Sequence, residues 1–450
     1  MLKNYTKHLS VLLVASFSLS ISLCANATLK IQQWQTSSGS EVYFVENHDL
    51  PIVDISANFA AGSARDSKEK SGLAGITKYM MTLGAAGMTD EVISNKLADI
   101  GAALSGEFDA DRAVFKLRTL SSKTEQTQAL NIFNAILQKP DFPDAVLSRE
   151  KARIVSGLRE SATQPESISN KAFITALYSN HPYALNESGE PETVAAIRQE
   201  DLKAFYNSHY TSKGAVIGLI GDMTVAQAHE IADRISNGLP HTPAVAALPV
   251  VKLPTSANEQ VIAHPASQSH ILLGYPGIKR GDPDLFPLYV GNYILGGGGF
   301  VSRLTEEVRE KRGLVYSVYS YFMPMSELGP FQIGLQTKRE QAGEALKLVR
   351  ETLDKFIANG VTDNELEAAK QNIVGGFPMR IDSNAKILDY LGVIGFYKLP
   401  LNYLDTYNAQ VEKVTTAQIK DAFARRIKAD KFVTVIVGGD VPKASNAAVK

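Results

Sequence analysis

Residues 72–80 read GLAGITKYM, and the sequence on either side of this stretch decides the fold. Apolar residues recur at helical spacing from about residue 71 to 83, and a second helical pattern runs from 90 to 100. Runs typical of strands lie at residues 29–34, 42–45, 52–59, 103–108, 113–117 and 215–220. The first half of the chain therefore combines short strands with helices.

The same order of elements returns in the second half. An amphipathic helix is predicted at 285–295, followed by strands at 315–321 and 330–335 and a helix at 340–358. The T-x-x-E spacing of Thr362 and Glu365 is a capping box, which predicts the start of another helix. The pattern indicates that the chain is built from two similar halves.

Two dipeptides give the period of this repeat. Leu83-Gly84 matches Leu295-Gly296 at an offset of 212 residues, and Gly221-Asp222 matches Gly439-Asp440 at an offset of 218. Because the two offsets nearly agree, we interpret the halves as copies of one structural unit.

Residues 241–258 separate the halves. They are rich in Pro and Ala and show neither a helical nor a strand period, which is typical of a linker. We therefore predict an N-terminal domain at 28–240 and a C-terminal domain at 259–450. The strand pairs and helices predict an α+β fold with two homologous domains, each a mixed, mainly antiparallel sheet with helices packed on one face.

The first 27 residues have the features of a secretory signal. Lys3 and Lys7 give a positive start, residues 9–23 are mostly apolar, and residues 25–27 form an A-x-A cleavage site. We predict that the mature chain begins near Thr28 and is exported across the inner membrane to the periplasm.

Composition excludes several other classes of protein. The chain has 450 residues, of which 44% are hydrophobic and 21% charged, as in ordinary globular proteins. Its only cysteine, Cys24, falls within the predicted signal, so the mature chain has no disulfide. Lipid attachment at Cys24 is disfavoured by the bulky Leu23 before it but stays open. Near-neutral charge argues against nucleic acid as a partner, and no later apolar run is long enough to span a bilayer.

Residues 72–80 resemble the zinc-binding helix of the insulinase/pitrilysin-type (M16) metallopeptidases, whose pattern there is G-x-A-H-x-x-E-H. Such a peptidase needs two histidines one helical turn apart, a glutamate that activates the metal-bound water, and a third ligand. By this resemblance, Gly75 and Tyr79 replace the histidines, and Lys78 replaces the glutamate.

The third ligand of this family is also absent. It is a glutamate that follows an Arg-Glu pair by seven positions, and here residues 149–150 are Arg-Glu whereas residue 157 is Gly157. The motifs at 181–183, 205–210 and 216–222 resemble the family in order and spacing. The resemblance therefore implies a degenerate zinc site and no metal or other cofactor in this chain.

The second half retains a longer motif. Residues 295–304, LGGGGFVSRL, and 306–317, EEVREKRGLVYS, resemble the signature of the family's C-terminal domain. The glycines are not a phosphate-binding loop, because no Gly-Lys-Ser/Thr follows them. The resemblance implies that Arg309 and Tyr316 hold the substrate of a zinc domain: the guanidinium donates to a peptide carbonyl, and the phenol stabilises an oxyanion.

Further substrate contacts are predicted in the glycine-rich segment, at Gly297, Gly298, Phe300 and Ser302. Taken without the resemblance, Arg309 is also consistent with one charge on a solvated helix, and Tyr316 with one strand aromatic among several; the retained motif around them favours the functional role. Elsewhere, the sequence that starts at His229 reads H-E-x-x-D and so lacks the second histidine of a zinc-binding H-E-x-x-H motif. The sequence also contains no G-x-S-x-G motif, which would indicate a serine hydrolase.

The resemblance also suggests a function. A working peptidase of this family consists of two such two-domain halves, on one chain or on two subunits, one with H-x-x-E-H and one with the Arg/Tyr pair. We predict a non-catalytic periplasmic subunit that gives Arg309 and Tyr316 to a homologous zinc-bearing partner, which cleaves unfolded peptides.

Two alternatives differ in class. The chain could be a peptide-binding or scaffold protein, for example a homodimer, that acts without a protease partner. A metallopeptidase with other ligands is disfavoured, because Gly75 and Gly157 have no side chain to coordinate a metal. Residues 104–108 occupy the place of the family's substrate-aligning strand, and we expect that strand to be idle or to bind without cleavage.

Overall fold

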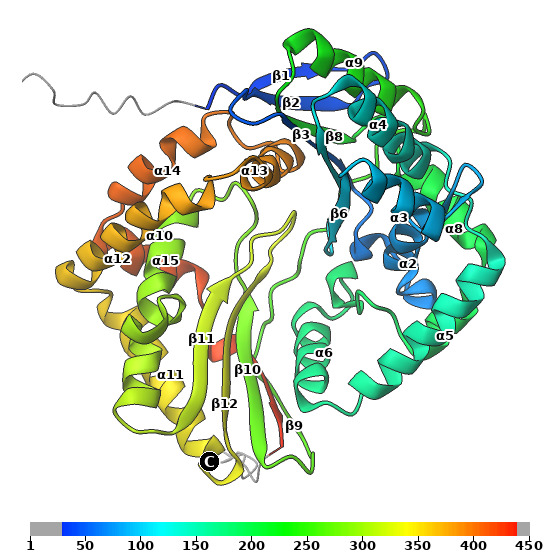
Figure 1. Cartoon of the computed structure of the whole chain (residues 1–450). Helices are drawn as coiled ribbons and strands as arrows, with labels where there is room; N and C mark the ends of the chain where they lie inside the picture. Colours follow the sequence, from blue (N-terminus) through cyan, green and yellow to red (C-terminus); the bar gives the residue numbers. More distant parts are fainter. Residues whose placement is uncertain (1–28, 439–450) are drawn as a thin grey trace, which may run out of the picture. The chain divides into compact units, whose positions relative to one another are not determined.

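The computed structural model describes residues 29–438, and from Ile31 onward they form one compact unit (Figure 1). The predicted signal, with Cys24, and the Gly439-Asp440 dipeptide lie outside the described residues. The larger sheet contains β1 (Gln32–Gln35), β2 (Glu41–Glu46), β3 (Ile52–Phe59), β6 (Ala103–Phe108), β7 (Ala113–Leu120) and β8 (Val216–Gly221). The second sheet contains β9 (Asn258–Ile262), β10 (Gln268–Pro276), β11 (Val315–Phe322), β12 (Pro330–Lys338) and β13 (Val433–Val437). A short hairpin joins β4 (Gly84–Ala85) and β5 (Met88–Thr89).

The two sheets share one order of five strands, to which the first sheet adds β1 at its edge. The first has the order β1-β2-β8-β3-β7-β6 and the second the order β11-β12-β10-β13-β9. Each is antiparallel except for one parallel pair, β2 with β8 and β9 with β13. β3 begins at residue 52 and its counterpart β10 at residue 268, an offset of 216 that lies between the two offsets in the sequence. The predicted α+β fold with two homologous halves is confirmed.

Helices surround both sheets. The first half contains α2 (Leu73–Met81), α3 (Asp90–Asp99), α4 (Lys123–Gln138), α5 (Asp144–Ser161), α6 (Pro165–Tyr178), α7 (Pro191–Ala196), α8 (Gln199–His209) and α9 (Val225–Asn237). The second contains α10 (Leu285–Asn292), α11 (Ala342–Asn359), α12 (Asp363–Gly376), α13 (Asn384–Phe396), α14 (Tyr403–Glu412) and α15 (Thr416–Arg426). The predicted capping box starts α12, with both reciprocal hydrogen bonds between Thr362 and Glu365 present.

Alternation along β3 explains how the first sheet is covered. Val53, Ile55 and the other odd-numbered side chains of this strand lie in the main hydrophobic core, as expected when every second side chain points to one face. On the opposite face, Asn58 packs against α13 from the second half, since a Cβ on Gly392 would lie 2.7 Å from its Oδ1. The approach is close: a Cβ on Gly395 would lie 2.4 Å from Val216 Cγ1, so only glycine fits there.

Conversely, α6 from the first half packs on the second sheet. Phe173 on α6 is fully buried, and a Cβ on Gly274 of β10 would lie 2.9 Å from its ring. Phe173 shares a core with Leu272 and with Val435 of β13. Each half therefore lends one helix to the sheet of the other half, visible in Figure 1 as α6 beside β10 and α13 beside β3.

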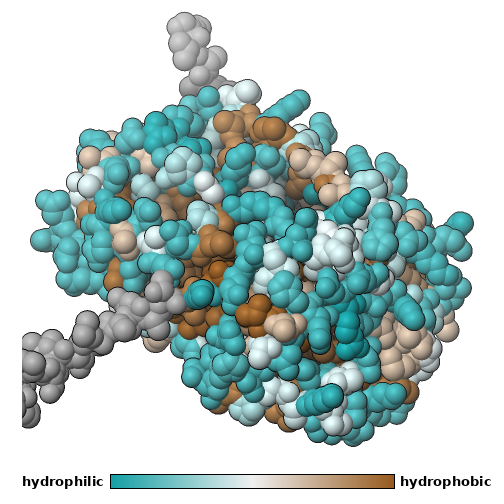
Figure 2. All heavy atoms as spheres, turned by 90° about the horizontal axis from the view of Figure 1, so that it is seen from above, coloured by the Kyte–Doolittle hydropathy of each residue, from teal (hydrophilic) through white to brown (hydrophobic). Residues whose placement is uncertain are grey.

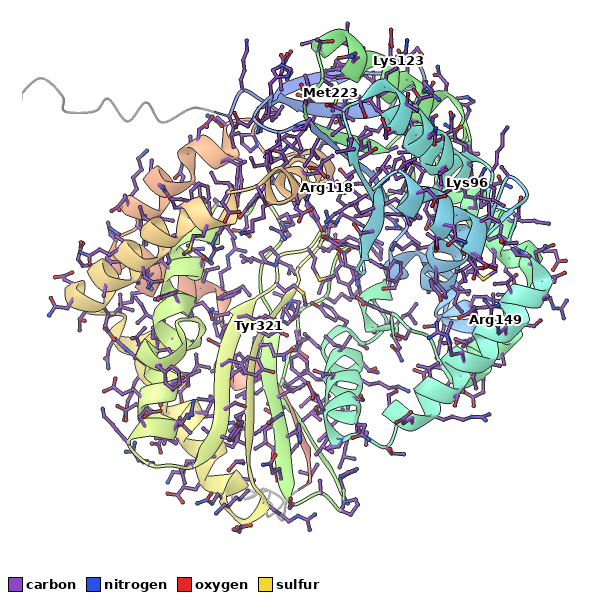
Figure 3. The ribbon with its side chains drawn as sticks, in the orientation of Figure 1. Lys96, Arg118, Lys123, Arg149, Met223 and Tyr321 are labelled. Atoms are coloured by element: carbon purple, nitrogen blue, oxygen red, sulfur yellow. The ribbon has the colours of Figure 1, made fainter. Side chains whose placement is uncertain are left out.

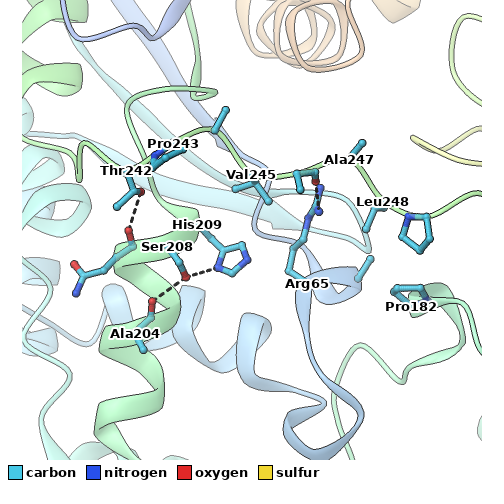
Figure 4. Close-up of a pocket in the computed structure, with 15 residues that line it drawn as sticks. Arg65, Pro182, Ala204, Ser208, His209, Thr242, Pro243, Val245, Ala247 and Leu248 are labelled. Carbon is cyan, nitrogen blue, oxygen red and sulfur yellow. Dashed lines mark hydrogen bonds between the residues drawn. The ribbon is translucent and has the colours of Figure 1, made fainter.

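The predicted linker is held against the first half. Thr242 Oγ1 donates to Asn207 O (3.0 Å), and Arg65 Nη1 donates to Ala246 O (2.6 Å) (Figure 4). The Nε2 atom of His181 lies 2.7 Å from Pro249 O. These contacts border a pocket of about 640 Å³. The linker is thus held by the first half up to Pro249, and Val251 is then buried in the core that α6 shares with the second sheet.

The face of the molecule drawn in Figure 2 is mostly hydrophilic. In the view from above, apolar side chains gather in the middle of the face and both sides are largely polar (Figure 2). Among residues 29–438, no helix has the length and apolar character needed to cross a bilayer.

Candidate functional site

The degenerate zinc-site positions lie on α2 and α5. The carboxylate of Asp66 fixes the start of α2, because it accepts hydrogen bonds from the backbone N–H groups of Gly72 and Ala74 (2.8 Å each). Gly72 itself has φ of +93°, a conformation that favours glycine. The helix is therefore formed at the predicted place, and its predicted ligand positions carry other residues.

Gly75 and Tyr79 lie one helical turn apart on α2. A Cβ on Gly75 would lie 3.3 Å from Cε1 of Phe108 on β6, so this position faces the edge of the sheet. The ring of Tyr79 is partly exposed, and the guanidinium of Arg153 on α5 lies 5.6 Å from its centroid. This cation–π contact joins α2 to α5, the two helices on which the resemblance places the lost ligands.

The Arg-Glu pair on α5 forms a structural ion cluster. Glu150 is buried and accepts from Arg153 (2.8 Å) and Arg149 (2.9 Å; Figure 3), and these hydrogen bonds hold the pKa of its carboxyl below the usual range. Gly157 lies two turns further along α5, and a Cβ there would meet no atom within 4 Å. This position has room for a side chain and supplies none.

Lys78 occupies the position of the family's catalytic glutamate. Its side chain is half-buried, its Nζ lies 5.4 Å from the centroid of the Phe115 ring, and burial lowers the pKa of the amine. A Cβ on Gly106 of β6 would lie 3.2 Å from this Nζ. Across residues 29–438, the Lys78 amine makes no hydrogen bond or ion pair. A cation without a partner therefore lies where a zinc peptidase needs a base.

No cluster of three or more His, Cys, Asp or Glu side chains within residues 29–438 has metal-binding geometry. We therefore expect elemental analysis of the dialysed chain to find no stoichiometric zinc, and EDTA to leave its melting temperature unchanged. The triple variant Gly75→His, Tyr79→His, Gly157→Glu should bind one zinc ion per chain, since all three ligands return. The variant without Gly157→Glu is the control and should bind zinc more weakly. Stoichiometric zinc in the unmodified chain would contradict the prediction.

The glycine-rich segment of the second half forms irregular turns. The predicted helix at 285–295 ends as an α-helix at Asn292 and continues as a π-helical turn, Tyr293–Gly297. A second π-helical turn, Thr305–Glu310, follows. Such turns are often found at functional sites. Sequence periodicity did not predict them, because a widened turn and an α-helix have nearly the same apolar spacing.

The four residues predicted to contact substrate in this segment differ from one another in burial and in role. Gly297 and Gly298 allow close backbone packing, since a Cβ on either would lie 2.7 Å from an atom of Asn292 or Tyr293. Phe300 projects from the surface and is 71% exposed. Ser302 is fully buried, and its hydroxyl donates to Gly299 O (2.7 Å). Ser302 therefore holds the turn, and substrate contact at these four residues stays a prediction.

Arg309 and Tyr316 both lie at the surface next to this segment. Arg309 is on the second π-helical turn, and its guanidinium lies 5.0 Å from the centroid of the Phe300 ring. Tyr316 is 74% exposed and lies at a bulge in the edge strand β11, where the register with β12 shifts between Val315 and Ser317. Bulges redirect side chains and often lie beside functional sites. The structure thus places Arg309 beside the Phe300 ring and leaves the Tyr316 phenol exposed on the neighbouring strand, and a joint role of the pair stays a prediction.

An ion pair anchors the segment to α12. Arg303 donates to both oxygens of Glu365 (2.6 and 2.7 Å), and its guanidinium lies 5.1 Å from the centroid of the Phe356 ring. The hydrogen bonds from Arg303 lower the pKa of Glu365 from 4.5 to about 2. The turn that carries Phe300 is therefore fixed to the helical layer of the second half.

The lowered pKa of Glu365 predicts that the stability of the fold depends on pH. Because the folded-state pKa of Glu365 is depressed, its stabilisation is present above pH 4.5 and is lost as the pH falls towards 2. Solvent screening limits the effect to about 1 kcal/mol. Glu365→Gln should therefore lower the free energy of unfolding in urea at pH 7 and have little effect near pH 2. Glu344→Gln, at an exposed position on α11, is the control. An equal loss at both pH values would contradict the assignment.

A cleft of about 1020 Å³ lies where the two halves meet. It is lined by α6, by the loop from Tyr183 to Pro191 and by residues of β11 and β12, which include Tyr321. Burial raises the pKa of the Glu187 carboxyl on this loop. Sequence reasoning missed this cleft, because its walls come from distant segments that share no motif.

Comparison with known proteins identifies the class. The model described as "Insulinase (Peptidase family M16)" matches residues 42–189, and that described as "Peptidase M16 inactive domain" matches residues 196–373. A crystal structure of a peptidase M16 inactive domain from Pseudomonas fluorescens is 38% identical, with a TM-score of 0.89 over 92% of this chain and 99% of that one. The chain belongs to the M16 peptidase family.

Within the family, some relatives of this chain are named as proteases and at least one is named as a non-peptidase. "Non-peptidase homolog YmxG" of Helicobacter pylori is 27% identical over 405 residues, which is 88% of this chain and 91% of the relative. "Uncharacterized zinc protease YmxG" of Bacillus subtilis is 23% identical and covers 79% of this chain and 86% of its own. Together with the substitutions at Gly75, Lys78, Tyr79 and Gly157, these matches agree with an inactive M16 homologue.

Proposed function

We propose that this chain is the non-catalytic subunit of a periplasmic heteromeric zinc metallopeptidase. In this proposal a homologous partner binds zinc and cleaves unfolded peptides, while Arg309 and Tyr316 of this chain bind the substrate and stabilise the transition state. The observation that carries the proposal is the combination of a zinc site without its ligands and a retained Arg309 and Tyr316, of which Arg309 is partly exposed and Tyr316 exposed. Loss of the zinc ligands alone would be expected of any homologue that has lost its function.

The geometry of the second half supports this role. The guanidinium of Arg309 and the phenol of Tyr316 make no hydrogen bond within residues 29–438, so both are available to a ligand. The nearest carboxylate to Arg309 is the neighbouring Glu310, at 3.7 Å. Both groups are held on rigid elements, one by the π-helical turn and one by a strand, as a preorganised site requires.

The second candidate is a peptide-binding or scaffold protein that acts without a protease partner. The edge strand β6 and Lys78, whose amine has no hydrogen-bond or ion-pair partner within the described part of the chain, favour it, because both could bind a peptide in this chain alone. The name of the Helicobacter relative, a non-peptidase homologue, is compatible with either function. A neighbouring gene for a homologue with an intact H-x-x-E-H motif would favour the first candidate.

The test is cleavage of a quenched fluorescent peptide by the mature chain, alone and mixed with a zinc-bearing homologue from the same cell. We expect no cleavage by this chain alone and a rate in the mixture above that of the homologue alone. No gain in the mixture would favour the binding or scaffold role. Chelator-sensitive cleavage by this chain alone would contradict both candidates.

A further inference from the structure

The pocket of about 640 Å³ beside the linker has the features of a binding site for a small molecule. We call it the linker pocket: residues 242–249 of the linker form one wall, and α8 with the turn Ser63–Arg65 forms the other (Figure 4). Most of the side chains that line it are Ala, Pro, Val or Leu, and among these lining residues none is Asp or Glu. Small-molecule sites commonly have this size and a mainly apolar lining with a few polar groups.

Arg65 is the positively charged group of the linker pocket. Its Nη1 atom donates to Ala246 O (2.6 Å), and its Nε atom is buried without a hydrogen-bond partner. Within residues 29–438, the bond to Ala246 O is the one hydrogen bond of this guanidinium, and the guanidinium forms no ion pair. A charge with reduced access to water is costly unless an anion or further acceptors contact it.

One acidic side chain acts on Arg65 from outside the linker pocket. Burial lowers the pKa of the Arg65 guanidinium, and the attraction of Asp111 opposes this effect without reversing it. The carboxylate of Asp111 instead accepts hydrogen bonds from Tyr183, Ser326 and Tyr397. The charge of Arg65 is therefore only partly balanced, and an anion in direct contact would stabilise it further.

His209, the other ionisable residue that lines the linker pocket, adds no second charge near pH 7. Its ring stacks on Phe205, with 4.1 Å between the centroids. Nδ1 lies 3.1 Å from Phe205 O, so this nitrogen carries the hydrogen. Burial lowers the pKa of the imidazole, and the charge of Arg65 acts in the same direction. The neutral ring forms a flat wall, and attraction of an anion depends on Arg65.

We propose that the linker pocket binds a small organic carboxylate with an apolar body. The carboxylate accepts a charge-assisted hydrogen bond from the guanidinium of Arg65. The apolar body lies against the alanine and proline side chains of the linker and α8, where its removal from water adds to the affinity. No lining residue belongs to α2 or to the segment around Arg309, so this site goes beyond both functions proposed above.

The test is isothermal titration calorimetry of the full mature chain with hexanoate. Hexan-1-ol has the same chain length without the charge, and acetate has the charge without the apolar body. We expect saturable binding of hexanoate, about tenfold tighter than that of either hexan-1-ol or acetate. Inorganic phosphate at the same ionic strength tests whether any anion is sufficient, and it should bind at least tenfold more weakly than hexanoate.

Two variants separate the charge from the space. Arg65→Met keeps an unbranched stem without the charge and should lower the affinity for hexanoate to that for hexan-1-ol. Ala204→Phe, at an exposed position of α8 that lines the linker pocket, fills the space and leaves Arg65 in place. It should weaken the binding of hexanoate and hexan-1-ol alike. Ala152→Phe, at an exposed position of α5 outside the pocket, is the matched control and should bind both as the unmodified chain does.

Several results would overturn this proposal. They are no saturable binding of hexanoate, equal affinity for hexanoate and hexan-1-ol, a preference for hexanoate that survives Arg65→Met, and unchanged binding by Ala204→Phe. Phosphate that binds as tightly as hexanoate would show a site for inorganic anions and would exclude the carboxylate with an apolar body. Circular dichroism checks that each variant is folded. The titrations need no protease partner, so their outcome is independent of the mixed-subunit cleavage assay.

Discussion

The double variant Arg309→Ala, Tyr316→Phe is expected to lower peptide cleavage by the mixed complex about a hundredfold, if this chain supplies transition-state contacts to a zinc-bearing partner. Tyr316 is exposed, Arg309 is partly exposed and both lie outside the hydrophobic core, so the substitutions should leave folding and subunit assembly unchanged. The measurement is kcat/KM for a quenched fluorescent peptide at fixed subunit ratio. Full activity of the variant complex would exclude the role of this pair.

The single variants separate the two roles. Tyr316→Phe removes only the phenol hydroxyl and should lower kcat with little change in KM, because oxyanion stabilisation acts in the transition state. Arg309→Ala removes a contact to the bound peptide and should mainly raise KM. Tyr319→Phe on the same strand is the matched control, together with Arg312→Ala, whose guanidinium is engaged by Glu307.

Local sequence signals predicted many individual elements. The predicted strands at 52–59 and 103–108 have the bounds of β3 and β6, since turn residues and a change of period mark both ends. The capping box at Thr362 starts α12 as predicted. The helix predicted at 285–295 ends as an α-helix at Asn292, because the glycines that follow allow the backbone to widen into a π turn.

Contacts between distant segments were not predicted. The exchange of α6 and α13 between the two sheets leaves no periodic signal, because each helix only shows that it has an apolar face. For the same reason the sequence did not reveal that Ser302 is buried or that Lys78 has no ion-pair partner among residues 29–438. The residue types at the candidate site were readable from the sequence, whereas their availability to a ligand depends on packing.

The contacts between the halves converge on one buried carboxylate. Asp111, in the turn between β6 and β7, is 2% exposed. It accepts hydrogen bonds from Tyr183 OH after α6 (2.6 Å), from the backbone N–H of Ser326 between β11 and β12 (2.7 Å) and from Tyr397 OH after α13 (3.0 Å). One side chain thus joins the first sheet to both exchanged helices and to a hairpin of the second sheet.

Asp111→Ala is therefore expected to lower the free energy of unfolding by about 3 kcal/mol. The substitution leaves three donors without their acceptor, and each buried donor left unpaired costs about 1–3 kcal/mol, although removing a buried charge offsets part of this loss. Tyr397→Phe removes one of the three hydrogen bonds and should cost about 1 kcal/mol. Asp99→Ala, at an exposed helix end, is the control and should change stability by less than about 0.5 kcal/mol. Urea unfolding followed by circular dichroism measures all three variants. A loss for Asp111→Ala no larger than that of the control would show that the exchanged helices alone hold the two halves together.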